Sequence, residues 1–309
     1  MTIQDAYTKS LIKTSNLITP IIIGTNSSSS NTGLQVMTDR DLINRLERIL
    51  SLNIDKIIIF GVPPLHDSNG TQALEKNGVV QSSLKIIRDS FDKKIQVIAD
   101  VCICQYNLSG HCGIVNQNNY PDNDKTLKLM SKIALSYAES GADMLAPSSM
   151  MDGLVLSIRN KLNLKGYRET KIMSFTKQFS SLYSPFRLTA YKKVSKIDKS
   201  NYQIGYANSR EILRKVELDY SEGANVITIK PSMANLDIIS KIRERVGCRI
   251  AVQHVSGEYA MLKAASRNNL INEYDWLLGY FACLARSGAD FIITYEAEGI
   301  AELLSNSKT

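Results

Sequence analysis

The chain has 309 residues, 44% hydrophobic and 22% charged, so it can bury a sizeable core and is not expected to be disordered. The net charge of +7 comes from scattered lysines with no basic run interleaved with aromatic residues, which argues against a nucleic-acid-binding protein. Because no apolar run approaches ~20 residues and the start lacks a signal-peptide core, we expect no membrane span and a cytoplasmic location.

Short apolar runs recur along the chain with helical stretches between them. In chain order, the strand candidates are residues 17–23, 57–62, 95–101, 142–147, 172–176, 225–229, 249–255 and 290–295. Helical spacing is clearest at 39–51, 126–139 and 235–246. Alternating strands and helices predict a parallel sheet, and eight units in roughly 250 residues predict a closed α/β TIM (β/α)8 barrel. A doubly wound open sheet is the alternative.

Three segments fall outside this alternation. Residues 1–16 precede the first strand and are predicted to form an N-terminal arm to a single barrel domain at 17–309. Residues 26–33 are predicted to form a polar loop. Residues 184–203 make a long connection after the fifth strand, and such connections often act as active-site lids. Barrel enzymes carry their chemistry at the carboxyl ends of the strands, so we expect the functional side chains at those ends.

The third strand ends in a cysteine cluster. Five cysteines in a long chain argue against a disulfide framework, and Cys102, Cys104 and Cys112 lie within eleven residues. Three thiolates can bind zinc and leave its fourth position open for Lewis-acid chemistry. Three buried cysteines without metal, or a redox pair at Cys102 and Cys104, are the alternatives. His111 could be a ligand or a structural neighbour.

Two lysines end adjacent strands, Lys177 the fifth and Lys230 the sixth. Burial lowers the pKa of a lysine and exposes an amine that can form a Schiff base with a ketone. Neighbouring barrel strands would bring the two amines together, so that each ammonium lowers the pKa of the other. Two surface lysines with their ammonium groups in solvent are the alternative.

Other polar residues near the strand ends have two readings each. Arg187 could clamp a carboxylate or lie solvated in the 184–203 segment. Ser256 could bind a ligand or cap a helix beginning near Glu258. Tyr295 could be a core aromatic residue or a hydroxyl donor.

Together these segments resemble the porphobilinogen synthase (5-aminolevulinate dehydratase) family over nearly the whole chain. The family's zinc motif is matched by DVCICQYNLSGHCG. Further family blocks are matched in the right order by GADMLAPSSMMDG, IMSFTKQFSSLYSPFR, ANVITIKP, VSGEYAM and SGADFIITY. The resemblance implies that two 5-aminolevulinate molecules condense to a pyrrole through lysine Schiff bases with zinc assistance.

The resemblance also implies two substrate positions, named for the propionyl and acetyl arms of the product. On the propionyl side, Lys230 would form the Schiff base. Asp100 and Ser148 would hold the amino group, and Ser256 and Tyr295 would bind the carboxylate.

On the acetyl side, Lys177 would form the second Schiff base. Zinc bound by the three cysteines would serve this substrate. Arg187, with Lys199 and Gln203, would bind the acetyl-side carboxylate. The resemblance also implies Tyr183 and Phe186 as substrate-binding residues.

The chain departs from the family pattern at four positions. Ser149 and Leu188 stand where the family has aspartate, Gln253 where it has tyrosine, and Lys199 where it has the lid's second arginine. The exchange at Lys199 replaces a planar guanidinium group by a compact ammonium group, which binds a carboxylate with weaker geometric control. These departures leave open a paralogue that uses the same chemistry on another amino ketone, or a non-catalytic zinc-bearing barrel. The resemblance further implies a homo-oligomer, usually an octamer.

We predict that allosteric magnesium activation is absent. Many bacterial members of the family bind an activating magnesium through a glutamate fifteen residues before the Schiff-base lysine, and Lys215 occupies that position here. Magnesium needs oxygen ligands, which an ammonium cannot provide. Activity and oligomer size should stay constant across a magnesium titration at fixed zinc and ionic strength. A saturable rise in activity that calcium cannot mimic would contradict this.

Overall fold

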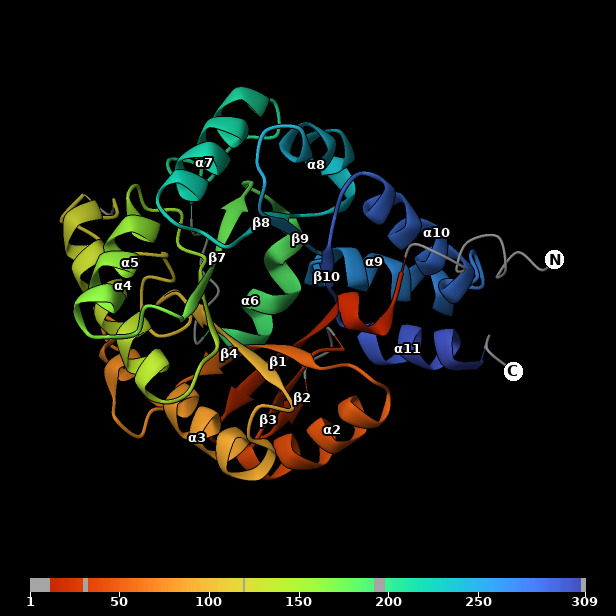
Figure 1. The fold of residues 1–309 in the computed structure, drawn as a ribbon, viewed down its shortest axis with the longest axis horizontal. Coiled ribbons are helices and arrows are strands. Elements are labelled where there is room, and N and C mark those ends of the chain that lie inside the picture. The colour runs from red at the N-terminus through yellow and green to blue at the C-terminus, as the bar shows by residue number, and fades with distance from the viewer. Residues whose placement is uncertain (1–11, 30–32, 119, 192–197, 307–309) are drawn as a thin grey trace.

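The computed structural model describes residues 12–29, 33–118, 120–191 and 198–306. Its centre is a barrel of parallel strands, in which each strand pairs with the next and β10 returns to β1 (Figure 1). The strands are β1 (Leu17–Gly24), β4 (Lys56–Val62), β5 (Gln96–Val101), β6 (Met144–Pro147), β7 (Lys171–Lys177), β8 (Val226–Lys230), β9 (Arg249–Gln253) and β10 (Phe291–Ile293). The predicted barrel is confirmed, and the open doubly wound sheet is wrong because β10 closes onto β1.

Helices surround the barrel as an outer ring (Figure 1). They are α2 (Asp39–Ser51), α3 (Val79–Phe91), α4 (Asn123–Glu139), α5 (Leu154–Leu164), α7 (Ser209–Ser221), α8 (Leu236–Arg243), α9 (Ser256–Arg267), α10 (Glu273–Arg286) and α11 (Ala297–Asn306). The predicted helices therefore form, with α4 beginning earlier because Asp122 caps it by accepting from the Lys125 backbone N–H. In the part of the chain that is described, no helix combines the length and apolarity that crossing a membrane requires.

The strands are apolar on both faces because both faces are buried. On β1, Ile18 and Ile22 point into the barrel, whereas Leu17, Ile21 and Ile23 pack against the helices. This arrangement explains why the strands read as continuous apolar runs in the sequence. It also makes a polar side chain at a strand end stand out.

The serine-rich segment differs in part from its prediction. Ser28–Ser29 (β2) pair antiparallel with Gln35–Met37 (β3), and β3 pairs with the end of β1 beyond its contact with β10. The loop assignment is therefore wrong for residues 28 and 29. Backbone hydrogen bonds to a neighbouring segment form this pair, and the side-chain pattern does not encode them. Of the predicted arm, residues 1–11 lie outside the described residues, and Thr14–Asn16 form a short 3-10 helix.

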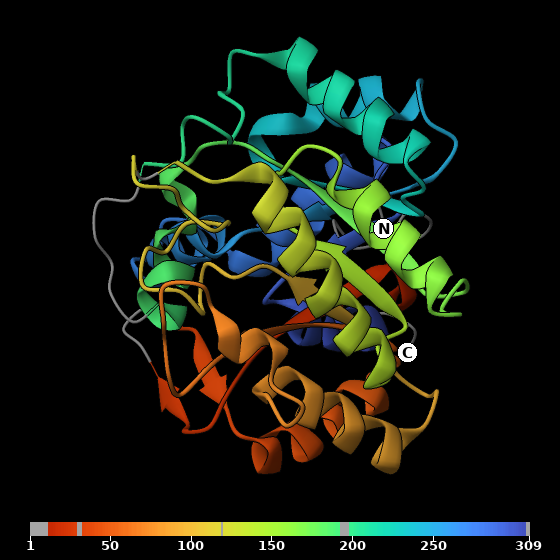
Figure 2. The ribbon, with the colours of Figure 1, turned by 90° about the vertical axis from the view of Figure 1, so that its left-hand side faces the viewer.

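The segment after β7 begins with a 3-10 turn, Ser181–Tyr183 (η3), and continues into α6 (Ser184–Ala190). Figure 1 shows α6 over the middle of the barrel rather than in the outer ring, and Figure 2 shows it at one end of the barrel. That end holds the carboxyl ends of the strands. Of the lid predicted at 184–203, residues 192–197 lie outside the described residues.

A repeated tripeptide fastens the opposite end of the barrel. The sequence G-A-D or G-A-N occurs at 141–143, 223–225 and 288–290, each time with its glycine at a φ between 103° and 110°. Each final side chain accepts a backbone N–H from the preceding strand: Val97 donates to Asp143 (2.8 Å), Ile172 to Asn225 (2.9 Å) and Ile250 to Asp290 (2.8 Å). The three bonds link β5 to β6, β7 to β8 and β9 to β10.

We predict that Asp290→Ala lowers the free energy of unfolding by about 2 kcal/mol, because it removes a charged hydrogen-bond acceptor from a partly buried backbone group. Asp290→Asn should cost less, since Asn225 makes the same backbone bond without a charge. Urea titration of both variants measures the difference. Equal losses would mean that the ion pairs of Asp290 with Arg243 and Arg249 carry the effect instead.

Candidate active site

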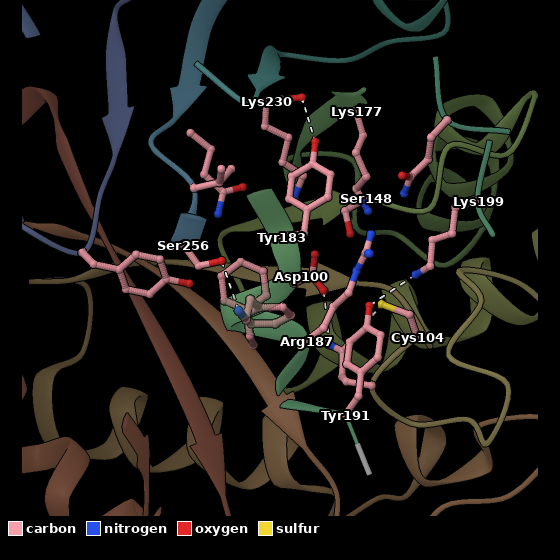
Figure 3. Close-up of a pocket in the computed structure, with 17 residues that line it drawn as sticks. Asp100, Cys104, Ser148, Lys177, Tyr183, Arg187, Tyr191, Lys199, Lys230 and Ser256 are labelled. Atoms are coloured by element: carbon pink, nitrogen blue, oxygen red, sulfur yellow. Dashed lines mark hydrogen bonds between the residues drawn. The ribbon is translucent and has the colours of Figure 1, made fainter. Parts of the chain in front are cut away.

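A pocket opens at the carboxyl ends of the strands, beneath α6 (Figure 3). Every site residue predicted from the sequence lines it, except Cys102 and Cys112, whose sulfurs lie within 4.8 Å of the Cys104 sulfur. The predicted residues that line the pocket are Asp100, Cys104, Ser148, Lys177, Tyr183, Phe186, Arg187, Lys199, Gln203, Lys230, Ser256 and Tyr295. Lining residues without a predicted role are Phe60, Gln105, Tyr191, Gln253 and Val255.

The two lysines lie side by side at the top of this pocket (Figure 3). The parallel register of β7 and β8 places Lys177 directly opposite Lys230, and each side chain is only 7% exposed. The Lys230 Nζ lies 4.2 Å from the centre of the Phe175 ring. Both lysines are therefore buried, unlike a surface lysine whose ammonium group lies in solvent.

Their electrostatic surroundings differ. Burial lowers the pKa of Lys230 to about 7, and the Lys177 ammonium acts in the same direction. Burial also opposes the charge on Lys177, but the nearby cysteine sulfurs, Cys112 foremost, outweigh it and raise the pKa of Lys177. At neutral pH, Lys230 is thus the better nucleophile.

Asp100 faces the same space from the end of β5. It is 4% exposed, and its Oδ2 accepts from the Gln105 side-chain amide at 3.3 Å. Among the described residues, its buried Oδ1 has no hydrogen-bond partner. Burial raises the pKa of Asp100, while the Lys230 ammonium and the Ser148 hydroxyl oppose that rise. An unpaired carboxylate oxygen in a dry pocket is costly unless a ligand supplies a donor, such as an amino group.

The three cysteines form the only cluster of metal-binding side chains found in the described part of the chain. Their sulfurs all lie within 4.8 Å of one another, all three residues are buried, and none is in a disulfide. Hydrogen bonds from the Cys102 and Cys104 thiols lower the pKa of Cys112, and the ammoniums of Lys177 and Lys199 act in the same direction. Three soft donors, one already favoured as a thiolate, suit zinc with an open fourth position.

His111 is not part of this donor set. Its Nδ1 meets the Tyr202 hydroxyl at 3.2 Å, and Tyr202 also accepts the Cys112 backbone N–H at 3.2 Å. The histidine thus supports the loop that carries Cys112. This observation favours the structural reading of His111.

Ser256 joins the pocket wall to the segment above it. Its hydroxyl accepts from the Phe186 N–H (3.1 Å) and donates to the Leu182 carbonyl (3.3 Å). The helix α9 begins at Ser256, two residues before the predicted start, and Glu258 rather than Ser256 caps it by accepting the Val255 N–H. A β-carbon on Gly257 would lie 2.4 Å from the Leu182 carbonyl, so this close contact requires glycine.

Tyr295 packs its ring against that of Tyr259, with the ring centres 5.6 Å apart.

The comparisons with known proteins agree with this geometry. A family model described as Delta-aminolevulinic acid dehydratase matches residues 1–303. The chain belongs to this family. It is 43% identical to the delta-aminolevulinic acid dehydratase of Helicobacter pylori, covering 91% of this chain and 87% of that protein. It is 40% identical to that of Archaeoglobus fulgidus, covering 94% of this chain and 91% of the relative.

A solved structure of a delta-aminolevulinic acid dehydratase, that of Toxoplasma gondii in complex with the product porphobilinogen, superimposes with a TM-score of 0.92. It is 33% identical and covers 97% of this chain and 88% of its own. The dehydratase family and the barrel fold implied by the sequence are both confirmed. As a member of this family, the chain is a lyase.

Two of the four departures from the dehydratase pattern face the pocket. Gln253 lines it beside Val255 and Ser256 and has no partner for its Oε1 within the described residues. Lys199 lines it too, but its Nζ donates to the Cys112 Sγ at 3.5 Å. Leu188 is exposed, and Ser149 is buried outside the lining. Two of the four departures therefore line the pocket, and the other two follow residues that line it.

The sequence did not point to Gln105 or Tyr191 as site residues. Gln105 donates to Asp100, and Tyr191 accepts from Lys199 at 3.3 Å. The only sequence feature that could have identified Gln105 as a site residue is its place inside the cysteine motif. No sequence feature identifies Tyr191, because its contacts depend on how the 184–203 segment folds back over the barrel.

We predict that Schiff-base formation by this protein accelerates as pH rises through about 7, because Lys230 must lose its proton to attack a ketone. Lys177→Met should move the midpoint upward, since it removes the ammonium that lowers the pKa of Lys230. Initial rates of cyanoborohydride trapping of 5-aminolevulinate at Lys230 would measure both midpoints. A wild-type midpoint near 10.5, the ordinary lysine value, would contradict the assignment.

Proposed function

We propose that this chain condenses two molecules of 5-aminolevulinate to porphobilinogen through Schiff bases on Lys230 and Lys177. The observation that carries the proposal is the pairing of these two buried lysines beside a cluster of three thiols. Membership of the dehydratase family supports the same reaction. A condensation of two amino ketones requires two carbonyl-binding amines, and this pocket provides them.

In the proposed mechanism, the neutral Lys230 amine attacks the ketone of the propionyl-side molecule, and loss of water gives an imine. Asp100 and Ser148 hold that molecule's amino group. The unpaired Oδ1 of Asp100 accepts a hydrogen bond from this amino group. Lys177 would bind the second ketone in the same way after losing its own proton.

Bound substrates carry carboxylates that need cationic or hydroxyl partners. Arg187 extends into the pocket, with its guanidinium 5.5 Å from the Tyr183 ring centre (Figure 3). We assign it, with Gln203, to the acetyl-side carboxylate. We assign Ser256 and Tyr295 to the propionyl-side carboxylate; Tyr183 and Phe186 complete the pocket wall. For Ser256, binding would require its hydroxyl to exchange the Leu182 carbonyl for the substrate.

We assign the cysteine cluster to zinc on the chemistry of its donors. Zinc on Cys102, Cys104 and Cys112 would supply a Lewis acid at its open position. The chain's own part is to hold three sulfurs together in a buried site beside the acetyl-side lysine, whose Nζ lies 3.8 Å from the Cys112 Sγ.

Assembly and location complete the proposal. We propose a cytoplasmic homo-oligomer, an octamer by family resemblance, without an activating magnesium. Lys215 forms an ion pair with Asp219 at 2.5 Å, so an ammonium and not a carboxylate occupies this position. Light scattering on the purified protein measures the assembly size.

Pyrrole formation from 5-aminolevulinate tests the function. We expect pyrrole from the wild type, and borohydride trapping followed by peptide mapping should mark Lys230. Lys230→Ala should abolish this trapping. Lys177→Ala should abolish turnover but retain part of the trapping, because Lys230 remains. Trapping without pyrrole would favour a paralogue that uses another amino ketone. Neither trapping nor pyrrole would favour a non-catalytic barrel.

A further inference from the structure

Lys199 is a buried cation whose contacts differ from those of a carboxylate clamp. It is 1% exposed, and its Nζ donates to the Cys112 Sγ (3.5 Å) and to the Tyr191 hydroxyl (3.3 Å). The ammonium also lies 5.3 Å from the centre of the Tyr191 ring. Within the described residues it forms no salt bridge with a carboxylate, so a cysteine sulfur is its nearest candidate for negative charge.

We propose that Lys199 is a positioning residue of the cysteine metal site, where its ammonium lies against the Cys112 sulfur and balances the charge of three thiolates. The proposal rests on the zinc assignment made under Proposed function. A divalent ion with three thiolates keeps one net negative charge. In a buried site, such a charge is costly unless a cation lies beside it.

The other cation at this site cannot fill the role throughout the reaction. Lys177 also donates to the Cys112 Sγ, at 3.8 Å. However, an amine attacks a ketone only in its neutral form, so Lys177 cannot supply a positive charge at the moment of attack. Lys199 is assigned no covalent step. It therefore holds the electrostatic balance of the cluster while Lys177 reacts.

The geometry also suits lysine at this position. A single sulfur offers one acceptor to a compact ammonium, whereas a planar arginine fork matches the two oxygens of a carboxylate. The same segment reaches Cys112 a second time, because Tyr202 accepts the Cys112 backbone N–H at 3.2 Å. Residues 198–202 thus contact both the side chain and the backbone of one proposed ligand. Metal binding and the position of this segment should be coupled.

Two matched lid variants test the proposal, Lys199→Met and Arg187→Met. Each removes one cation that lines the pocket, but only Lys199 contacts a cysteine sulfur. We expect Lys199→Met to weaken zinc binding about 10-fold or more, as loss of a ligand's supporting partner does. Arg187→Met should keep wild-type zinc affinity and raise the KM for 5-aminolevulinate. Lys199→Arg should retain most of the affinity because it keeps the charge. Competition with a chromophoric chelator measures the affinities.

Wild-type zinc affinity in Lys199→Met, with a KM raised as in Arg187→Met, would overturn the proposal and restore the carboxylate role. A second measurement needs no variant: hydrogen–deuterium exchange across residues 198–204 should increase when zinc is removed from the wild type. Unchanged exchange would also overturn the coupling. If the expected zinc affinities and exchange are observed but no pyrrole forms, the proposed reaction is refuted and the role of Lys199 is not. A wild type without zinc affinity would overturn the metal assignment while leaving Lys230 trapping untouched.

Discussion

Burying two ammonium groups side by side is costly unless negative charge lies beside them. The arrangement of the pocket follows from this constraint. Strand register places Lys177 opposite Lys230. The thiol cluster then separates their behaviour, because it favours the charge on Lys177 while burial lowers the pKa of Lys230 to about 7. Burial and the sulfurs therefore shift the pKa values of the two amines in opposite directions. A shift of one residue in either strand would abolish the arrangement.

The barrel separates stability from chemistry along its axis. At the amino ends of the strands, the G-A-D and G-A-N tripeptides use their carboxylates and amide to satisfy backbone N–H groups. At the carboxyl ends, the polar atoms of Asp100, Gln203 and Gln253 include buried oxygens without partners among the described residues. Unsatisfied groups are tolerated where a ligand can complete them, so these three oxygens are available to a ligand in the pocket.

The departures from the dehydratase pattern acquire different meanings once their positions are known. Leu188 is exposed and Ser149 lies outside the pocket lining, so neither argues for a changed substrate. Gln253 lies beside the residues assigned to the propionyl-side carboxylate. Lys199 lines the pocket and donates to the Cys112 sulfur, so its position is compatible with the role proposed for it beside the cysteine cluster.

The sequence by itself determined the barrel and most of the pocket lining. Apolar runs revealed the strands because both faces of each strand are buried, and a closed parallel barrel brings all carboxyl ends to one mouth. Lys177, Lys230 and the cysteine motif were therefore placed together correctly. What the tertiary structure decided were contacts between distant segments. Lys199 and Cys112 are separated by 87 positions, and the Ser256 hydroxyl bonds to residues some 70 positions away. Such contacts depend on how a loop folds over the barrel, which local periodicity does not encode.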